Sequence, residues 1–161
     1  MITLKDVFIG GVAGVVGTMA MPVVTKLMYR HESQEKKDLE EKLRPEPPFK
    51  TMTKKIVHGV NVNPSKETMR TLSMGMHWGY GIAWGVLYGA LRKKYPVLSK
   101  FGGALFGTLF FLIGDELVNT AFKITPPPQK FPIDAHVRGL MGHLTFTAAA
   151  EGTCKLLHKV V

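Results

Sequence analysis

Cysteine is almost absent from this chain of 161 residues, and acidic residues are few. The one cysteine, Cys154, excludes an intramolecular disulfide and a cysteine-rich metal site. Twelve acidic residues stand against 21 lysines and arginines, for a formal net charge of +9. Such an excess is typical of nucleic-acid-binding proteins or of the flanks of membrane helices. Because nucleic-acid-binding motifs are also missing and many cations border apolar segments, the second explanation is favoured and no nucleic-acid partner is expected.

Charge is scarce in four long segments of the chain. We predict that they are membrane-spanning helices, at residues 7–29, 71–91, 101–122 and 135–157. About 20 apolar residues are enough to cross a bilayer, and each segment reaches that length. The first segment lacks a clear signal-peptide cleavage site, so we interpret it as a retained span. The expected fold class is therefore all-α, a polytopic membrane protein with a single domain over residues 1–161.

Residues 30–70 are strongly charged and are predicted to form a helical segment outside the membrane. The sequence from 31 to 44 consists largely of charged helix formers, which predicts a solvated helix, with an extension of the first span as one option. Three prolines at positions 45, 47 and 48 end this helix.

The second half of the charged segment has two further signals. Residues 49–62 predict a short amphipathic piece on the membrane surface, with its lysines towards the lipid headgroups. The tripeptide Asn63-Pro64-Ser65 then offers a turn and an N-cap, so the next helix is expected to begin near Lys66.

Glycine, by contrast, is abundant, and five glycines fall within residues 75–89. Each costs about 1 kcal/mol in a water-exposed helix, so such a stretch is not typical of a soluble helix. In a bilayer, small residues at every fourth position let helix backbones approach closely. We therefore assign helix packing to the glycines with this kind of spacing: Gly10, Gly14, Gly75, Gly79, Gly81, Gly85, Gly89, Gly103 and Gly107.

Ionisable residues from three predicted spans fall at a similar depth. At a rise of 1.5 Å per residue, two histidines and two acids lie roughly 9–12 Å from the same ends of their spans. Intramembrane polar residues normally face the bundle interior and have partners. The predicted intramembrane polar cluster comprises His77, Asp115, Glu116, Asn119, His143 and Glu151. Within it, the expected pairs join His77 or His143 to Asp115 or Glu116.

Four interpretations of this cluster stay open. It is a hydrogen-bonded network that fixes the helix register, a route for protons or solutes, a ligand site, or a catalytic site. For the ligand site, His77 and His143 are the candidate ligands of a metal or a haem. A pigment pocket formed by Trp84, Phe110 and Phe111 is a related option. No nucleophile motif is visible, so no catalytic residue is assigned and no cofactor is predicted.

The distribution of cations predicts an orientation. Four spans place both termini on one side of the membrane, together with the short loop between the second and third spans. That loop has four cations and no acid: Arg92, Lys93, Lys94 and Lys100. By the positive-inside rule this side is cytoplasmic.

Three separate pieces of the chain carry a resemblance to a known family. They are His77-Trp78 with the glycine-rich run to Gly89, Gly114-Asp115-Glu116 with the prolines at 126–128, and His136 followed by Gly142-His143-Leu144. Together they resemble the YagU-like family of small bacterial integral membrane proteins of unknown function, over residues 70–157. The resemblance implies a multi-pass inner-membrane protein and supplies no catalytic residues.

The sequence therefore favours a non-enzymatic inner-membrane protein. Its many glycine faces favour an accessory subunit of a larger membrane complex, with the lipid bilayer and other membrane subunits as partners. One alternative is a small transporter or a proton or ion channel that uses the polar cluster. The other is a haem- or pigment-binding membrane subunit.

Overall fold

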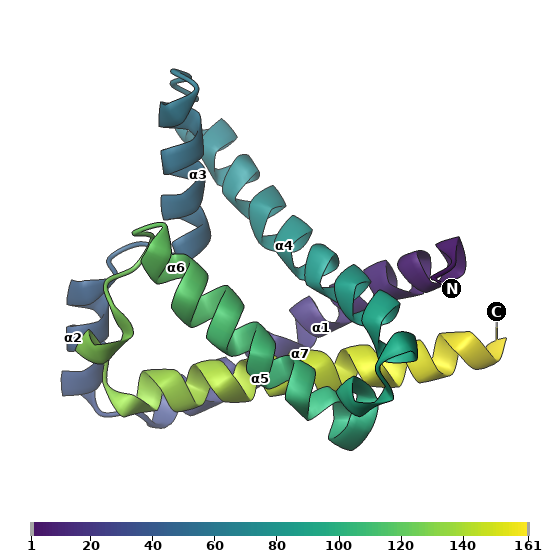
Figure 1. Cartoon of the computed structure of the whole chain (residues 1–161). Coiled ribbons are helices and arrows are strands. Elements are labelled where there is room, and N and C mark those ends of the chain that lie inside the picture. Colours follow the sequence, from purple (N-terminus) through teal and green to yellow (C-terminus); the bar gives the residue numbers. More distant parts are fainter. Residues whose placement is uncertain (1, 161) are drawn as a thin grey trace.

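The computed structural model describes residues 2–160, where all regular structure is helical (Figure 1). This confirms the all-α fold class. Four long helical segments form the body: α1 (Leu4–His31), α4 (Lys66–Lys94), α7 (Ile133–Val160), and a composite third segment. The composite segment consists of η1 (Pro96–Gly103), α5 (Ala104–Phe110), the π-helical η2 (Phe111–Leu117) and α6 (Val118–Ala121). The shorter elements are α2 (Gln34–Leu43), α3 (Pro48–Gly59) and η3 (Pro128–Lys130).

Helix α4 begins where the sequence predicts. The Ser65 hydroxyl accepts a hydrogen bond of 3.1 Å from the backbone N–H of Thr68, so the predicted N-cap is confirmed. Helix α1 has a capping box of its own, in which Thr3 and Asp6 satisfy each other's backbone N–H groups. Two of the long helices thus have starts that are fixed by local chemistry.

The charged helix α2 is not an extension of α1. The chain becomes extended at Glu32 (φ −73°, ψ 150°), and α2 turns back beside the start of α7 (Figure 1). Long-range ion pairs account for the turn, because Glu32 binds Arg138 and Lys36 lies 2.7 Å from Asp134. The option of a continuous helix is therefore wrong.

Helix α1 packs against both α4 and α7, and it is antiparallel to each of them. Its contact with α4 brings the two backbones together. A Cβ added at Gly10 would lie 2.7 Å from the carbonyl oxygen of Gly85, and one added at Gly14 would lie 2.6 Å from that of Gly81. Since side-chain carbons do not approach other atoms within 3.0 Å, only glycine fits here.

The remaining glycines of the predicted set differ from one another. Gly89 lies against the Asp6 and Gly10 backbone of α1, and Gly103 and Gly107 lie against Thr147 of α7. Gly75 and Gly79, in contrast, have no atom within 4 Å of an added Cβ. Seven of the nine glycines therefore meet other helices, and two face open space.

Beside a buried apolar core, the bundle has both buried polar side chains and many exposed apolar ones. The most deeply buried side chains include Asp6, Thr147 and Glu151. Exposed apolar residues form stripes at helical spacing on α1 and on the composite segment: Leu4, Phe8, Val16, Met19, Val23 and Leu27, and Leu105, Leu109, Leu112, Ile113 and Leu117. Large apolar patches on a surface mark contact with a membrane or a partner.

Two segments within residues 2–160 are long and apolar enough to cross a membrane, by length and composition: Leu4–His31 and Pro96–Ala121. Helices α4 and α7 are as long but do not meet this standard. In α7 the charged residues Arg138 and Glu151 interrupt the apolar sequence, and α4 is rich in glycine and ends in three cations. The expectation of four spans is thus supported for two of them.

Candidate polar site inside the helix bundle

A π-helical turn places two of the three acids of the predicted cluster. Element η2 (Phe111–Leu117) holds Asp115 and Glu116 within the composite segment, next to Gly114. A Cβ at Gly114 would lie 2.5 Å from the Tyr80 hydroxyl, so this turn packs closely on α4. Asn119, one turn later, donates a hydrogen bond of 2.8 Å to Oδ1 of Asp115. Single π-helical turns inside α-helices occur frequently at functional sites.

A polar cavity of about 250 Å³ lies where α2, α6, the proline-containing loop and the start of α7 meet. We call it the outer cavity. Glu116 lines it and accepts a hydrogen bond of 2.7 Å from Nδ1 of His136, whose Nε2 lies 3.0 Å from the Pro128 carbonyl oxygen. The buried hydroxyl of Thr120 also lines the cavity and has no hydrogen-bond partner among the described residues. The outer cavity thus contains a hydroxyl group that could still form a hydrogen bond with a ligand.

A second cavity of about 120 Å³ lies deeper in the bundle, and we call it the inner cavity. Four members of the predicted cluster line it: His77, Asp115, Asn119 and His143. They come from α4, the composite segment and α7. The sequence therefore identified residues that one cavity brings together.

Asp115 and Asn119 line both cavities. A hydrogen bond of 2.8 Å joins the two side chains one helical turn apart. A carboxylate in this place can accept a proton or bind a small cation from either cavity. Chains of acids and histidines inside membrane proteins are typical of proton relays.

The predicted pairing of histidines with acids is wrong in detail. His143 directs Nδ1 to its own helix, 2.8 Å from the Gly139 carbonyl oxygen, and its ring lies 4.4 Å from that of Phe110. His77 packs edge-on against Phe49, with ring centroids 4.9 Å apart. Among residues 2–160 the histidine that Glu116 contacts is His136. A depth calculated for straight α-helices does not include the π-helical turn that redirects Glu116 towards the start of α7.

A comparison with known families matches residues 16–152 to the family described as "Protein of unknown function (DUF1440)". The chain belongs to this family. The segment matched to DUF1440 includes every residue named above for the outer and inner cavities. The comparisons found no match among curated proteins and none among solved structures.

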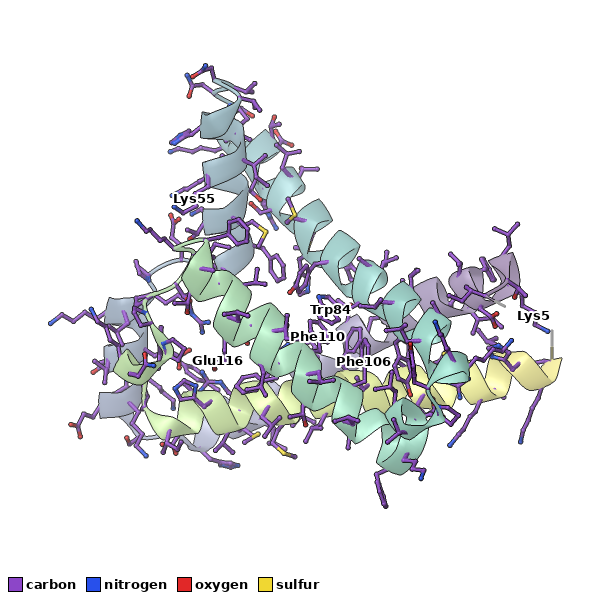
Figure 2. All side chains as sticks on the ribbon, in the orientation of Figure 1. Lys5, Lys55, Trp84, Phe106, Phe110 and Glu116 are labelled. Atoms are coloured by element: carbon purple, nitrogen blue, oxygen red, sulfur yellow. The ribbon has the colours of Figure 1, made fainter. Side chains whose placement is uncertain are left out.

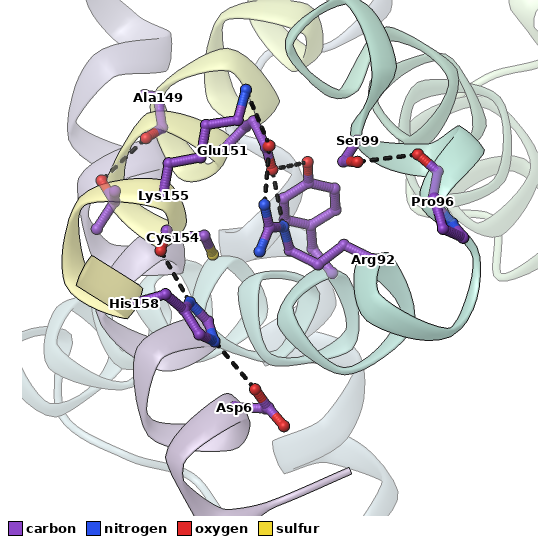
Figure 3. Close-up of polar contacts among 11 residues, drawn as sticks. Asp6, Arg92, Pro96, Ser99, Ala149, Glu151, Cys154, Lys155 and His158 are labelled. Atoms are coloured by element: carbon purple, nitrogen blue, oxygen red, sulfur yellow. Dashed lines mark hydrogen bonds and ion pairs between the residues drawn. The ribbon is translucent and has the colours of Figure 1, made fainter. Parts of the chain in front are cut away.

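Glu151 lines neither the outer nor the inner cavity and lies near the end of the DUF1440 segment, and Figure 3 shows its polar contacts. Its carboxylate accepts two hydrogen bonds of 2.8 Å from Arg92 and one of 2.6 Å from the Tyr88 hydroxyl. A neighbouring group joins Asp6 to His158 at 3.0 Å and to Lys93 at 2.6 Å. These contacts tie α1, α4 and α7 together at the end that holds both termini.

The inner cavity is small for the haem or pigment that two of the ligand-site interpretations require. His77 and His143 share the inner cavity, which is smaller than the roughly 300–1,000 Å³ of cavities that hold drug-sized ligands. A haem between them would require this cavity to enlarge. Within residues 2–160 no three metal-ligating side chains are grouped to hold an ion. Trp84 stacks on Phe110 with centroids 4.2 Å apart, so no further planar group fits between these rings (Figure 2).

Several polar residues that line the outer cavity were not in the predicted cluster, among them the ionisable residues His136, Arg138, Glu40 and Arg44. Only His136 had a usable signal, because it lies seven residues before His143 on the same face of the helix. Arg138 binds Glu40 and Glu32, which are 98 and 106 residues away in the sequence. Contacts between residues so far apart produce no periodic pattern in the sequence from which they could be predicted.

Proposed function

We propose that this DUF1440 protein is a multi-pass protein of the bacterial inner membrane, in which protons or a small cation reach Asp115 through the outer cavity. The membrane location is supported by buried polar residues and exposed apolar stripes on α1 and the composite segment. The YagU-like resemblance favours the inner membrane. In this proposal α4 and α7 complete a bundle of four spans, and their polar residues face inwards.

One observation carries the proposal for transport. Asp115 and Asn119 line both the outer and the inner cavity, so the carboxylate is the group through which a proton would pass between them. The histidines at 77 and 143 then offer imidazole nitrogens on the inner side. Imidazole is suited to this step because its ordinary pKa of about 6.5 lies near physiological pH.

The direction of uptake is inferred from the cations in and beside the short loop between α4 and the composite segment. Arg92, Lys93, Lys94 and Lys100 lie at the end of the molecule that carries the termini, which the positive-inside rule assigns to the cytoplasm. The outer cavity lies at the opposite end, so uptake would start from the periplasmic side. The ring stack of Trp84 and Phe110, and the contacts of Glu151 beyond it, close the cytoplasmic end and would have to open for release.

Proton flux into liposomes tests this proposal. The purified protein is reconstituted with an enclosed pH-sensitive dye, and valinomycin with a potassium gradient sets the driving potential. We expect the wild type to acidify the lumen faster than empty liposomes, and Asp115→Asn to lose most of that flux. Asp38→Asn makes the same chemical change on α2, away from both cavities, and should keep the wild-type rate. A wild type that matches empty liposomes, or Asp115→Asn that matches the wild type, would contradict proton transport through Asp115.

An accessory subunit of a larger complex is the second candidate. Its support is the pair Gly75 and Gly79, which lie one turn apart on α4 and face open space. Small residues with this spacing suit the close approach of another membrane helix. Gly75→Leu together with Gly79→Leu should release a partner on a native gel in mild detergent and leave the monomer folded. A wild type that migrates as a monomer under these conditions would contradict the subunit role.

A further inference from the structure

The upper part of α4 and helix α3 enclose a groove outside the bundle, where the two helices form a hairpin (Figure 1). Its volume is about 750 Å³, the largest of the cavities described here. We call it the hairpin groove. It is separate from the outer cavity, and its lining is largely apolar, with Phe49, Met69 and Met74 among the residues along it.

Four cations line the two walls of the groove. Lys50 and Lys54 lie one turn apart on α3, and Lys66 and Arg70 lie one turn apart on α4. Residues four apart project from the same face of a helix, so each wall presents a pair of cations. Like charges brought together in this way favour an anionic occupant.

The groove has little negative charge of its own. Glu46 lies 2.6 Å from Lys54 and 3.0 Å from Lys50, and within residues 2–160 no ion pair involves Lys66 or Arg70. Hydrogen bonds from Lys54 and then Lys50 hold the pKa of Glu46 below its ordinary value. The α3 wall is therefore partly neutralised, and the α4 wall keeps its positive charge for a ligand.

We propose that the hairpin groove binds one anionic phospholipid. Its phosphate would lie against the α4 cations Lys66 and Arg70, and an acyl chain would cover Phe49, Met69 and Met74. A free phosphate would satisfy the cations but leave these apolar side chains in water, whereas a phospholipid satisfies both. Basic pockets between helices near a membrane surface are suited to anionic headgroups. This inference rests on the proposed membrane location and is independent of proton uptake.

Native mass spectrometry of the detergent-solubilised full chain, titrated with lipid, tests the proposal. We expect a phosphatidylglycerol adduct with a stoichiometry of one that persists at detergent exchange, and much weaker adducts of phosphatidylcholine. The double variant Lys66→Gln/Arg70→Gln should weaken the phosphatidylglycerol affinity roughly thirtyfold, because it removes two cations that act on the phosphate. The control Lys42→Gln/Lys55→Gln removes the same charge at exposed sites outside the groove and should keep the wild-type affinity.

Other outcomes contradict the proposal in distinguishable ways. Equal affinity of the wild type for both lipids, or an unchanged affinity in Lys66→Gln/Arg70→Gln, would show that the groove does not select an anionic lipid. Displacement of the lipid by millimolar glycerol 3-phosphate would show that the site takes the headgroup alone. Met74→Gln changes an exposed apolar residue without removing charge and should also weaken the adduct, which tests the acyl-chain part. Extraction of the protein by alkaline carbonate would instead overturn the membrane location itself.

Discussion

Arg92 donates two hydrogen bonds of 2.8 Å to the carboxylate of Glu151, although the two residues are 59 positions apart in the sequence (Figure 3). Glu151 is only 3% exposed, and the Tyr88 hydroxyl supplies a third hydrogen bond to it. Bidentate contacts between arginine and a carboxylate are among the strong ion pairs in proteins. The pair therefore fixes the end of α4 against α7.

Removal of Arg92 alone should be strongly destabilising. Arg92→Met leaves a buried carboxylate without its main partner, at an expected cost of about 3–5 kcal/mol. The double variant Arg92→Met/Glu151→Met should recover most of that loss, because it removes both charges. Thermal unfolding in detergent, followed by circular dichroism, measures the difference, with Lys94→Met as the matched control on the same turn. Equal stability of Arg92→Met and Lys94→Met would contradict a structural role for the pair.

Glycine substitutions on α4 should differ sharply according to position. An alanine at Gly85 would bring its Cβ within 2.5 Å of the Gly10 carbonyl oxygen, so α1 and α4 must move apart and the protein should lose several kcal/mol. An alanine at Gly79 meets nothing within 4 Å and should stabilise the helix by up to about 1 kcal/mol. The unfolding midpoints of the two variants, measured side by side, test the close approach. Two midpoints on the same side of the wild type would be inconsistent with it.

A double-mutant cycle at Glu116 and His136 should give a coupling energy of about 1 kcal/mol, since both side chains are partly exposed and joined by one hydrogen bond of 2.7 Å. The variants are Glu116→Gln, His136→Gln and their combination, compared by unfolding in detergent. The cycle Glu116 with His143 serves as the control, because no hydrogen bond joins that pair in residues 2–160. A larger coupling for Glu116 with His143 would support the pairing expected from depth alone.

The start of α3 should loosen in acid. Because Lys54 and Lys50 hold the pKa of Glu46 below its ordinary value of about 4.3, this ion pair stabilises the fold above that value and is lost as the pH falls through the lowered folded pKa. Hydrogen exchange, corrected for its intrinsic pH dependence, should show falling protection of the backbone amides of residues 50–54 below about pH 4. Glu46→Gln should show low protection at every pH, and Glu41→Gln should behave as the wild type. Equal pH profiles for Glu46→Gln and the wild type would contradict this role.

Local signals predicted the helices well, and the long-range contacts poorly. Ser65 caps α4 as expected, since a cap depends on residues within one turn. Four members of the polar cluster share the inner cavity because depth along straight helices is nearly additive. The π-helical turn at 111–117 departs from the regular rise and rotation of an α-helix, and Glu116 there contacts His136.

Other contacts lay beyond any sequence pattern. Arg138 meets Glu32 and Glu40 only because α2 folds back on α7, and a separation of about a hundred residues has no periodicity to detect. Glu151 shares the polar face of α7 with His143 but lies two turns further on, so its partners come from the far end of α4. Position on a face was predictable, whereas the choice of neighbour depended on how the helices were assembled.

Phe49 and His77 line both the inner cavity and the hairpin groove, just as Asp115 and Asn119 line both the inner and the outer cavity. The inner cavity thus shares lining side chains with each of the other two hollow spaces, and these side chains form the boundaries between them. Side-chain rotations take place far faster than the movement of whole helices. Rotation of Phe49, His77, Asp115 or Asn119 would therefore change a boundary between neighbouring cavities while the backbone keeps its position.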